Sequence, residues 1–271
     1  MQIPAAPGGV LARNMDMPGG MDHSVGIPPK RGFPMLQLMT FPPGLDEPSH
    51  SPFCAKAMIL LQLAGVDWEP DWHLDPRKAP LGKLPALRTP DGIVPDSTLI
   101  LRWLTGQGAD LFPGLGLEER AQAHVLMRMV EDTLRQGLVH DRWARDDCWA
   151  VMGPVFFATV PAPLRGIVSG IMRGRVVKGL KSHGIARFSE GDRLTQMGAD
   201  LDSLTVQLGE KDWLFGDQPT AADASTLPVL SMIDHLPVRT RLRDNLRGRD
   251  NLMGYVARGR ERLYAGLPLT L

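Results

Sequence analysis

The sequence predicts an α/β domain followed by an all-helical domain, and two observations carry this prediction. In the first part of the chain, short apolar stretches typical of strands alternate with a helical pattern. Beyond residue 117, apolar residues recur at helical spacing and no further pair of strands is indicated. With 271 residues, the chain can hold two domains, each with its own core. We expect a mobile tail over residues 1–34, the α/β domain over 35–108 and the helical domain over 117–271.

A strand, a buried helix and a second strand should open the α/β domain. Residues 35–41 form a short apolar stretch that ends in a proline-rich loop. Ser51 and Pro52 mark a helix start, because serine is a good N-cap and proline a good first helical residue. The run over 53–64 is apolar on almost every side, so the helix should be buried, and Gly65 can end it. Alternating apolar residues over 66–74 then predict a strand parallel to the first.

A hairpin and a short helix should complete this domain. Residues 84–88 and 93–95 flank a Pro-Asp-Gly turn, which is typical of an antiparallel hairpin. Asp96 follows as the N-cap of a short helix. This order of elements is that of a thioredoxin-like domain. In the helical domain, Thr220 and Asp223 predict a reciprocal cap at the start of a buried helix, with a purely structural role.

The composition excludes several classes of function. Thirty basic and 30 acidic residues give a formal net charge of +0, so we expect no nucleic-acid surface and no polybasic membrane anchor. Cys54 and Cys148 are the only cysteines; they lack zinc-type spacing, so no metal site is predicted, and a reducing compartment is favoured. The first 34 residues lack the apolar run of a secretion signal. We therefore expect a cytoplasmic protein.

Residues 149–172 are the one stretch that suggests a membrane segment. Three prolines and Arg165 interrupt it before it reaches the roughly 20 apolar residues that a transmembrane helix needs. We therefore expect no transmembrane segment and a core or interface position for these side chains. Peripheral membrane contact is the alternative.

The segment Ser51-Pro52-Phe53-Cys54 places a hydroxyl and a thiol on the first turn of the predicted buried helix. Free backbone N–H groups and the helix dipole stabilise an anionic sulfur at such a position. In the structural alternative, Ser51 only caps the helix and Cys54 only fills the core.

Two further dipeptides suggest a ligand site. A proline at the start of a strand removes a ladder donor, and a cis Leu84-Pro85 bond would turn the preceding N–H and C=O toward a peptide-like ligand. Asp96-Ser97 at a helix start offers N–H groups and a hydroxyl to a carboxylate, while Asp96 suits an α-amino group. An ordinary trans proline and a plain N-cap are the structural alternatives.

These motifs occur in the order and at the spacing found in the glutathione transferase superfamily, which the chain resembles from about residue 35 to residue 264. Residues 182–189 are similar to the branch of failed-axon-connection and metaxin proteins. The residues that carry the superfamily resemblance are Ser51-Pro52-Phe53-Cys54, Gly82-Lys83-Leu84-Pro85-Ala86-Leu87, Asp91-Gly92, Asp96-Ser97 and the stretch from Trp213 to Asp223.

The resemblance implies a glutathione site in the first domain. The Leu84 backbone, before a cis-Pro85, would pair with the cysteinyl part of glutathione. Asp96 and Ser97 would hold the γ-glutamyl end, and Lys83 or Lys78 would meet the glycine carboxylate.

The resemblance also implies an activity. The only tyrosines lie near the C-terminus, so no early phenol can serve the thiol, and Ser51 is expected to stabilise the glutathione thiolate. The thiolate would attack a small electrophile in a groove between the domains, lined by residues such as Trp143, Trp149 and Phe156. The expected protein is a homodimeric glutathione S-transferase.

Two alternatives stay open. Cys54 matches the second, more buried position of a Cys-x-x-Cys motif. Because Ser51 stands at the first position, disulfide cycling within the motif is impossible, but a monothiol exchange through Cys54 is conceivable. The chain could instead be a non-catalytic interaction module, like a metaxin. Leu84-Pro85 and Asp96-Ser97 favour a working ligand site, and the expected lack of a membrane anchor argues against a metaxin-like outer-membrane role.

Overall fold

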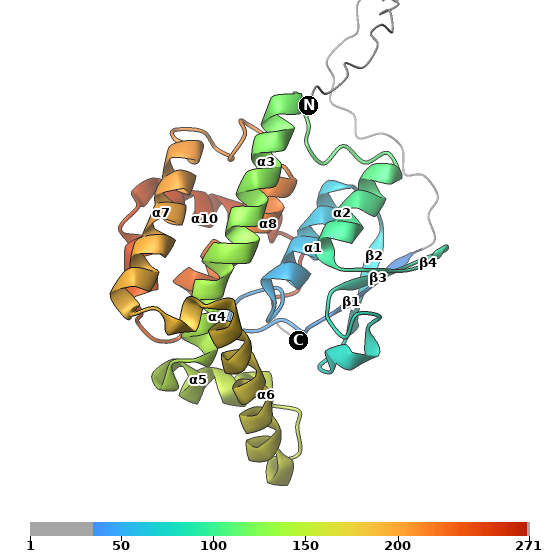
Figure 1. The fold of residues 1–271 in the computed structure, drawn as a ribbon. Coiled ribbons are helices and arrows are strands. Elements are labelled where there is room, and N and C mark those ends of the chain that lie inside the picture. The colour runs from blue at the N-terminus through green and yellow to red at the C-terminus, as the bar shows by residue number, and fades with distance from the viewer. Residues whose placement is uncertain (1–34, 270–271) are drawn as a thin grey trace, which may run out of the picture.

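The computed structural model describes residues 35–269, and its sheet belongs to the first part of the chain (Figure 1). The expected tail lies outside the described residues. The strands are β1 (Leu36–Thr40), β2 (Trp68–Trp72), β3 (Ala86–Thr89) and β4 (Gly92–Pro95). They lie in the order β2-β1-β3-β4, with β1 and β2 parallel and the other neighbours antiparallel. This confirms the predicted parallel unit and the predicted hairpin.

Helix α1 (Pro52–Leu63) is the central element of the first part. Ser51 occupies its N-cap, every residue over 54–61 is buried, and Gly65 follows its end with a φ of 64°. A positive φ at this place suits glycine, which has no Cβ to clash. One side of α1 covers the sheet beside α2 (Ser97–Gly106), and another packs on α8 (Ala221–Asp234) (Figure 1).

The rest of the described chain is helical, and no strand follows β4 within residues 96–269. Helix α3 (Leu117–Met129), a π-helical turn η2 (Val130–Leu134) and helix α4 (Arg135–Trp143) follow one another without a break in the helical backbone. The helical spacing predicted beyond residue 117 is confirmed, but the π-helical turn was not anticipated. The remaining helices are α5 (Asp146–Phe156), α6 (Ala162–His183), α7 (Glu190–Leu208), α9 (Arg241–Arg247) and α10 (Asp250–Leu263), with short 3₁₀ turns η1 (Pro76–Lys78) and η3 (Ile185–Arg187).

One continuous hydrophobic core spans the α/β part and the helical part, where the sequence suggested a core for each. The reason is α8, all of whose residues are buried, including the side that faces α1. Its start carries the predicted reciprocal cap: the Thr220 N–H donates to Asp223 at 2.7 Å, and the same carboxylate accepts from the Leu214 N–H at 3.0 Å and the Tyr255 hydroxyl at 3.2 Å. The structural role predicted for this pair is confirmed.

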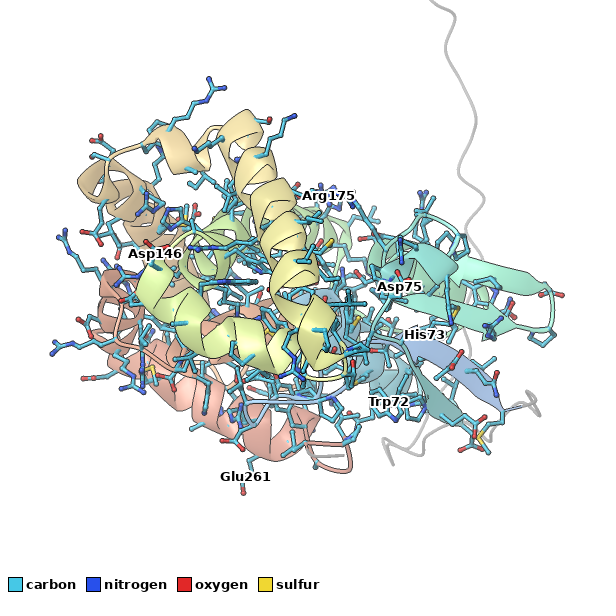
Figure 2. All side chains as sticks on the ribbon, turned by 90° about the horizontal axis from the view of Figure 1, so that it is seen from below. Trp72, His73, Asp75, Asp146, Arg175 and Glu261 are labelled. Carbon is cyan, nitrogen blue, oxygen red and sulfur yellow. The ribbon has the colours of Figure 1, made fainter. Side chains whose placement is uncertain are left out.

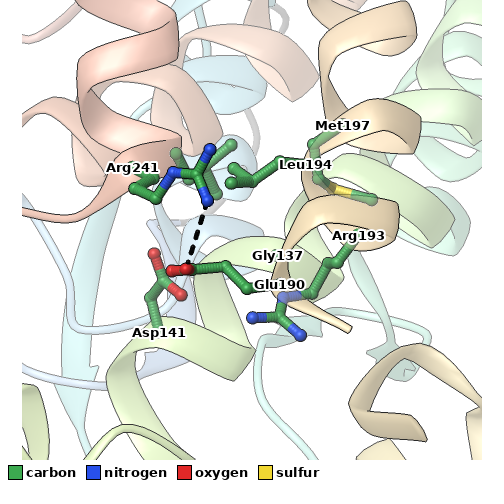
Figure 3. Close-up of a pocket in the computed structure, with 8 residues that line it drawn as sticks. Gly137, Asp141, Glu190, Arg193, Leu194, Met197 and Arg241 are labelled. Atoms are coloured by element: carbon green, nitrogen blue, oxygen red, sulfur yellow. Dashed lines mark hydrogen bonds and ion pairs between the residues drawn. The ribbon is translucent and has the colours of Figure 1, made fainter. Parts of the chain in front are cut away.

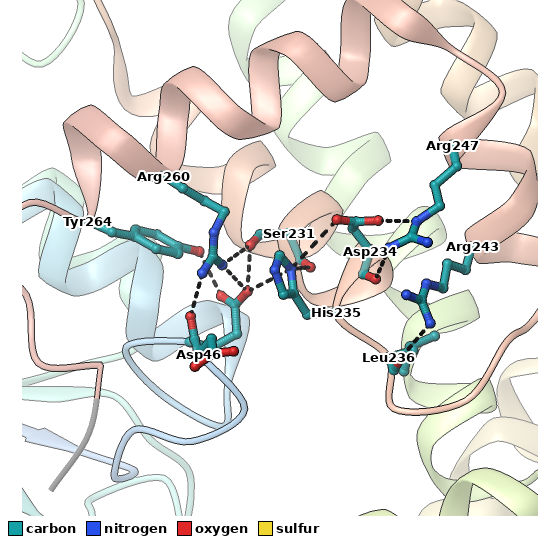
Figure 4. Close-up of polar contacts among 10 residues, drawn as sticks. Asp46, Ser231, Asp234, His235, Leu236, Arg243, Arg247, Arg260 and Tyr264 are labelled. Carbon is teal, nitrogen blue, oxygen red and sulfur yellow. Dashed lines mark hydrogen bonds and ion pairs between the residues drawn. The ribbon is translucent and has the colours of Figure 1, made fainter.

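A buried carboxylate fixes the loop between β1 and α1 to the helical part (Figure 4). Glu47 accepts hydrogen bonds from Ser231 at 2.5 Å, from Arg260 at 2.7 Å and from the Tyr264 hydroxyl at 2.9 Å. Burial raises the pKa of Glu47, and these partners act in the opposite direction. The same loop ends at Ser51, so these contacts hold the start of α1 in place.

Helix α6 departs from the expected core position. Leu180 is its only buried residue, while Leu164, Ile167 and Ile171 are exposed. Pro161 and Pro163 start a helix that leads out of the body of the molecule (Figure 1), and these apolar side chains stay more than half exposed. No helix among the described residues is long and apolar enough to cross a membrane.

Candidate functional site

Ser51 has a hydroxyl that does not cap the helix. It is the N-cap of α1 with extended backbone angles, and its side chain makes no capping hydrogen bond. Within the described residues, the first-turn N–H groups of Phe53 and Cys54 also have no backbone partner. The start of α1 therefore offers two N–H groups and a half-buried hydroxyl.

Cys54 lies beneath this surface and is completely buried. Hydrogen bonds to this thiol lower its pKa; they come from the hydroxyls of Thr40, Ser51 and Ser49 and from the Phe41 backbone. Burial outweighs them and raises that pKa. A buried thiol with a raised pKa is a poor nucleophile.

Leu84-Pro85 lies beside the start of α1. The bond is cis, as the ligand-site hypothesis requires. Leu84 shares one small apolar cluster with Cys54, Met39, Ala79 and Ala86, so the loop before β3 packs directly on the first turn of the helix. Among the described residues, nothing donates to the Leu84 carbonyl or accepts from its N–H.

Asp96 and Ser97 lie next to Pro85. The Asp96 N–H donates to the Pro85 carbonyl at 3.0 Å, and the Asp96 side chain accepts from the Thr98 N–H at 2.8 Å as the N-cap of α2. Asp96 has a φ of 69° and a ψ of 138°, a conformation that costs a residue with a Cβ about 1–3 kcal/mol and that clusters at functional sites. Its carboxylate is exposed, whereas Ser97 is only 1% exposed.

The predicted lysines lie on the loop between β2 and β3. Lys78 and Lys83 are both exposed, and Ala79 between them belongs to the cluster that holds Leu84 and Cys54. Asp75 on the same loop is paired with Arg77, which lowers the pKa of that carboxyl to about 2. Figure 2 shows Trp72, His73 and Asp75 where the chain leaves β2.

Aromatic side chains of the helical part reach the loop that ends at Ser51. Trp143 on α4 stacks with Phe156 on α5 at 5.3 Å between ring centroids, and Trp149 lies 5.1 Å from Trp143. The ring of His50 lies 5.3 Å from that of Phe156. Of the three aromatic residues expected to line the groove, Phe156 thus contacts the neighbour of Ser51, and Trp143 and Trp149 follow behind it in one aromatic cluster.

Sequence reasoning missed two residues at this junction. His50 is neighbour to Ser51, and burial together with Arg142 lowers its pKa to about 4, so its ring is neutral near pH 7. Arg142 is buried and donates to the His50 carbonyl at 3.0 Å, which places a positive charge behind the loop. The position of His50 beside Ser51 was a usable signal. Arg142 is 92 residues away in the sequence, so no spacing could connect the two.

Two hollows lie elsewhere. The cavity in Figure 3 has about 10 Å³ of room, enough for at most one water molecule, and its polar side chains are engaged by contacts such as the 3.3 Å pair of Arg241 and Glu190. A larger groove of about 550 Å³ lies between α2 and α3 and begins at Thr98, beside Asp96. It is lined by Arg102 and Thr105 on α2 and by Arg120 and His124 on α3.

Two family models match the chain. Residues 52–148 match the model described as the glutathione S-transferase N-terminal domain, and residues 197–259 match the glutathione S-transferase C-terminal domain. Among characterised proteins, the isoprene-epoxide glutathione S-transferase of Rhodococcus is 28% identical over 84% of this chain and 98% of its own length. Failed axon connections of Drosophila melanogaster is 27% identical over 80% of this chain and 55% of its own length. Mouse metaxin-1 is 28% identical over 67% of this chain and 60% of its own length. The chain therefore spans little more than half of the last two relatives.

Solved structures share the fold. A glutathione S-transferase from Methylobacterium radiotolerans, in complex with glutathione sulfonate, superposes with a TM-score of 0.55 at 23% identity over 88% of this chain and 97% of its own. A beta-etherase from Sphingobium gives a TM-score of 0.57 at 17% identity, over 86% of this chain and 98% of its own. At these identities the likeness concerns the fold alone.

Proposed function

We propose that this chain, which belongs to the glutathione transferase superfamily and to its metaxin-like branch, binds glutathione at the start of α1 and transfers it to a small electrophile. One observation carries the proposal: the non-capping hydroxyl of Ser51, the unpaired backbone groups of Leu84 and the strained Asp96 adjoin one another where the start of α1 meets the loop before β3. The complex of a solved relative with glutathione sulfonate supports the ligand class.

Each part of glutathione has a complementary group beside the start of α1. Its cysteinyl N–H and C=O match the free carbonyl and N–H of Leu84, which Pro85 presents. Asp96 has an exposed carboxylate for the α-amino group, and the N–H groups at the start of α2, with Ser97, suit the γ-glutamyl carboxylate. The exposed Lys83 or Lys78 suits the glycine carboxylate.

Ser51 activates the thiol of the bound glutathione in this proposal. A hydrogen bond to an anion contributes about 1.5–3 kcal/mol. The helix start adds about 0.3–1 kcal/mol. Lowering a thiol pKa from about 8.5 by one to two units needs about 1.4–2.7 kcal/mol. The two contributions suffice without a general base, and the buried charge of Arg142 behind the loop acts in the same direction.

The thiolate sulfur forms a bond to an electrophilic carbon, and the bond from that carbon to its leaving group breaks. With an epoxide, the ring C–O bond breaks and the oxygen takes a proton from water. The isoprene-epoxide transferase among the relatives favours a small epoxide. Trp143, Trp149 and Phe156 supply an apolar wall for it.

We further propose a cytoplasmic homodimer. The free thiols of Cys54 and Cys148 suit a reducing compartment. The groove between α2 and α3 is large and open, so a second copy of the chain could cover it. Sedimentation velocity tests this: a dimer that Thr105→Arg converts to a monomer supports the groove as the interface, and a wild-type monomer contradicts the proposal.

A non-catalytic interaction module is the second candidate, because the names metaxin-1 and failed axon connections describe no reaction. A Cys54 monothiol transferase finds less support, since the thiol is buried and its pKa is raised. Titration calorimetry with glutathione separates the candidates. Binding of glutathione supports the transferase, and absence of binding supports the non-catalytic interaction module.

If glutathione binds, Ser51→Ala and Cys54→Ala are compared in a conjugation assay with an epoxide. We expect loss of turnover in the Ser51 variant and near-normal turnover in the Cys54 variant. The reverse pattern would assign the reaction to Cys54.

A further inference from the structure

The region around α6 is strongly basic in a chain that is neutral as a whole. Residues 149–189 contain six lysines and arginines and no acidic residue, so the remainder of the chain carries a net charge of −6. This region also falls largely between the two family-model matches, which end at residue 148 and resume at residue 197. The six basic residues are Arg165, Arg173, Arg175, Lys178, Lys181 and Arg187.

Helix α6 is attached to the body of the molecule by its second half. Leu180 is buried, and Arg173 donates to the Trp143 carbonyl at 2.8 Å and to Asp146 at 2.7 Å. The first half of the helix extends away from the body of the molecule in Figure 1, with the loop from α5 beside it. This free end is accessible from several sides.

The outward face of α6 combines apolar and basic side chains in one stripe. Leu164, Ile167 and Ile171 follow one another at helical spacing and are 53%, 63% and 52% exposed. Arg175 and Lys178 continue the stripe toward the second half and are exposed as well. Figure 2 looks onto this helix, with Arg175 beside it. The stripe is therefore apolar at the free end and cationic behind it.

We propose that this stripe docks on an anionic membrane surface, with Leu164, Ile167 and Ile171 among the lipid headgroups and Arg175 and Lys178 against the phosphates. Charge complementarity selects a negative partner, because no acidic residue interrupts the basic region. The exposed branched side chains select lipid over a nucleic acid, since they gain from burial at the acyl boundary and have no role on a phosphate backbone. Peripheral docking of this kind requires no membrane-spanning helix.

Vesicle flotation with the full chain tests the proposal. Vesicles of phosphatidylcholine are compared with vesicles in which phosphatidylserine replaces part of it, at low and at high salt. The chain should float with the anionic vesicles alone, and salt should weaken the association.

Two double variants then locate the contact. Arg175→Gln with Lys178→Gln should lower the partition coefficient about 25-fold, at roughly fivefold for each basic residue. Ile167→Ser with Ile171→Ser should lower it about tenfold or more. Matched controls on other surfaces should change nothing: Leu117→Ser with Val206→Ser, which are 90% and 81% exposed, and Lys211→Gln with Arg239→Gln.

Three outcomes would overturn the proposal: no flotation with anionic vesicles, equal flotation with phosphatidylcholine alone, or equal losses in the α6 variants and the controls. Binding to duplex DNA or to polyglutamate in place of vesicles would overturn it too. Glutathione calorimetry on the same variants keeps this proposal separate from the proposed function, because α6 contributes no residue to the glutathione site.

Discussion

Lys56 on α1 and Glu131 on the π-helical turn η2 form an ion pair of 2.6 Å with both side chains almost fully buried. The pair connects the α/β part with the helical part inside their common core. Two charges removed from water in this way stabilise the fold only through each other, because each alone would remain desolvated and unpaired.

Removal of one partner should therefore cost more than removal of both. Lys56→Met should lower the free energy of unfolding by about 3 kcal/mol, the lower part of the range for broken buried pairs, since Arg128 lies 3.7 Å from Glu131 and compensates in part. Lys56→Met with Glu131→Leu should recover most of this loss. Urea denaturation measures both, and a double variant that loses the sum of the single losses would contradict the account.

The cap of α8 should be a second sensitive position. Asp223→Ala removes the acceptor of the Thr220 N–H, the Leu214 N–H and the Tyr255 hydroxyl, all buried. We expect a loss of about 3 kcal/mol or more, because each orphaned donor carries a desolvation cost. Thermal denaturation measures it, with the exposed Asp217→Ala as the control that should stay near wild type.

His50 should make stability depend on pH. Its folded pKa of about 4 lies below the ordinary 6.5, so the unfolded chain binds a proton between these values and the folded chain does not. The contribution of neutral His50 to the free energy of unfolding is therefore fully present above pH 6.5. It decreases as the pH falls from 6.5 to about 4, and it no longer changes below pH 4. The total change is about 3 kcal/mol.

His50→Gln isolates this effect, because the buried carboxyls titrate alike in both proteins. Urea denaturation at each pH gives the free energy of unfolding of both proteins. The difference in favour of wild type should shrink by about 3 kcal/mol from neutral pH to pH 4. Parallel stability curves would show that His50 is not the buried neutral group described above.

Both thiols should be protected in the folded chain. Cys54 and Cys148 are buried, and burial raises the pKa of Cys148 to about 11 and that of Cys54 in the same direction. Ellman's reagent should therefore react with them only after denaturation. Rapid modification of Cys54 in the native state, identified by peptide mapping, would revive the monothiol mechanism.

Local signals explain what could be predicted from the sequence. The hairpin follows from its Pro-Asp-Gly turn, the ends of α1 from Ser51 and Gly65, and the cap of α8 from Thr220 and Asp223. The position of Ser51 was predicted too, but the side chain does not cap, which only the structure could show.

Contacts between distant segments explain what could not be predicted. Glu47 and Arg260 are 213 residues apart, and His50 meets Arg142 across 92 residues. Lys56 on a mostly apolar helix gave no indication of its partner. The exposure of Ile167 and Ile171 depends on where α6 points, and apolar composition alone suggested a core position.

A pH titration of the thiolate absorbance of bound glutathione tests the central claim most directly. The Cys54→Ala background removes the thiol nearest to the site, and the titration of the ligand-free chain is subtracted. We predict a thiol pKa one to two units below the roughly 8.5 of a free thiol, and a return toward the free value when Ser51→Ala is added. A bound thiol with an unshifted pKa, or a shift that survives Ser51→Ala, would contradict the account.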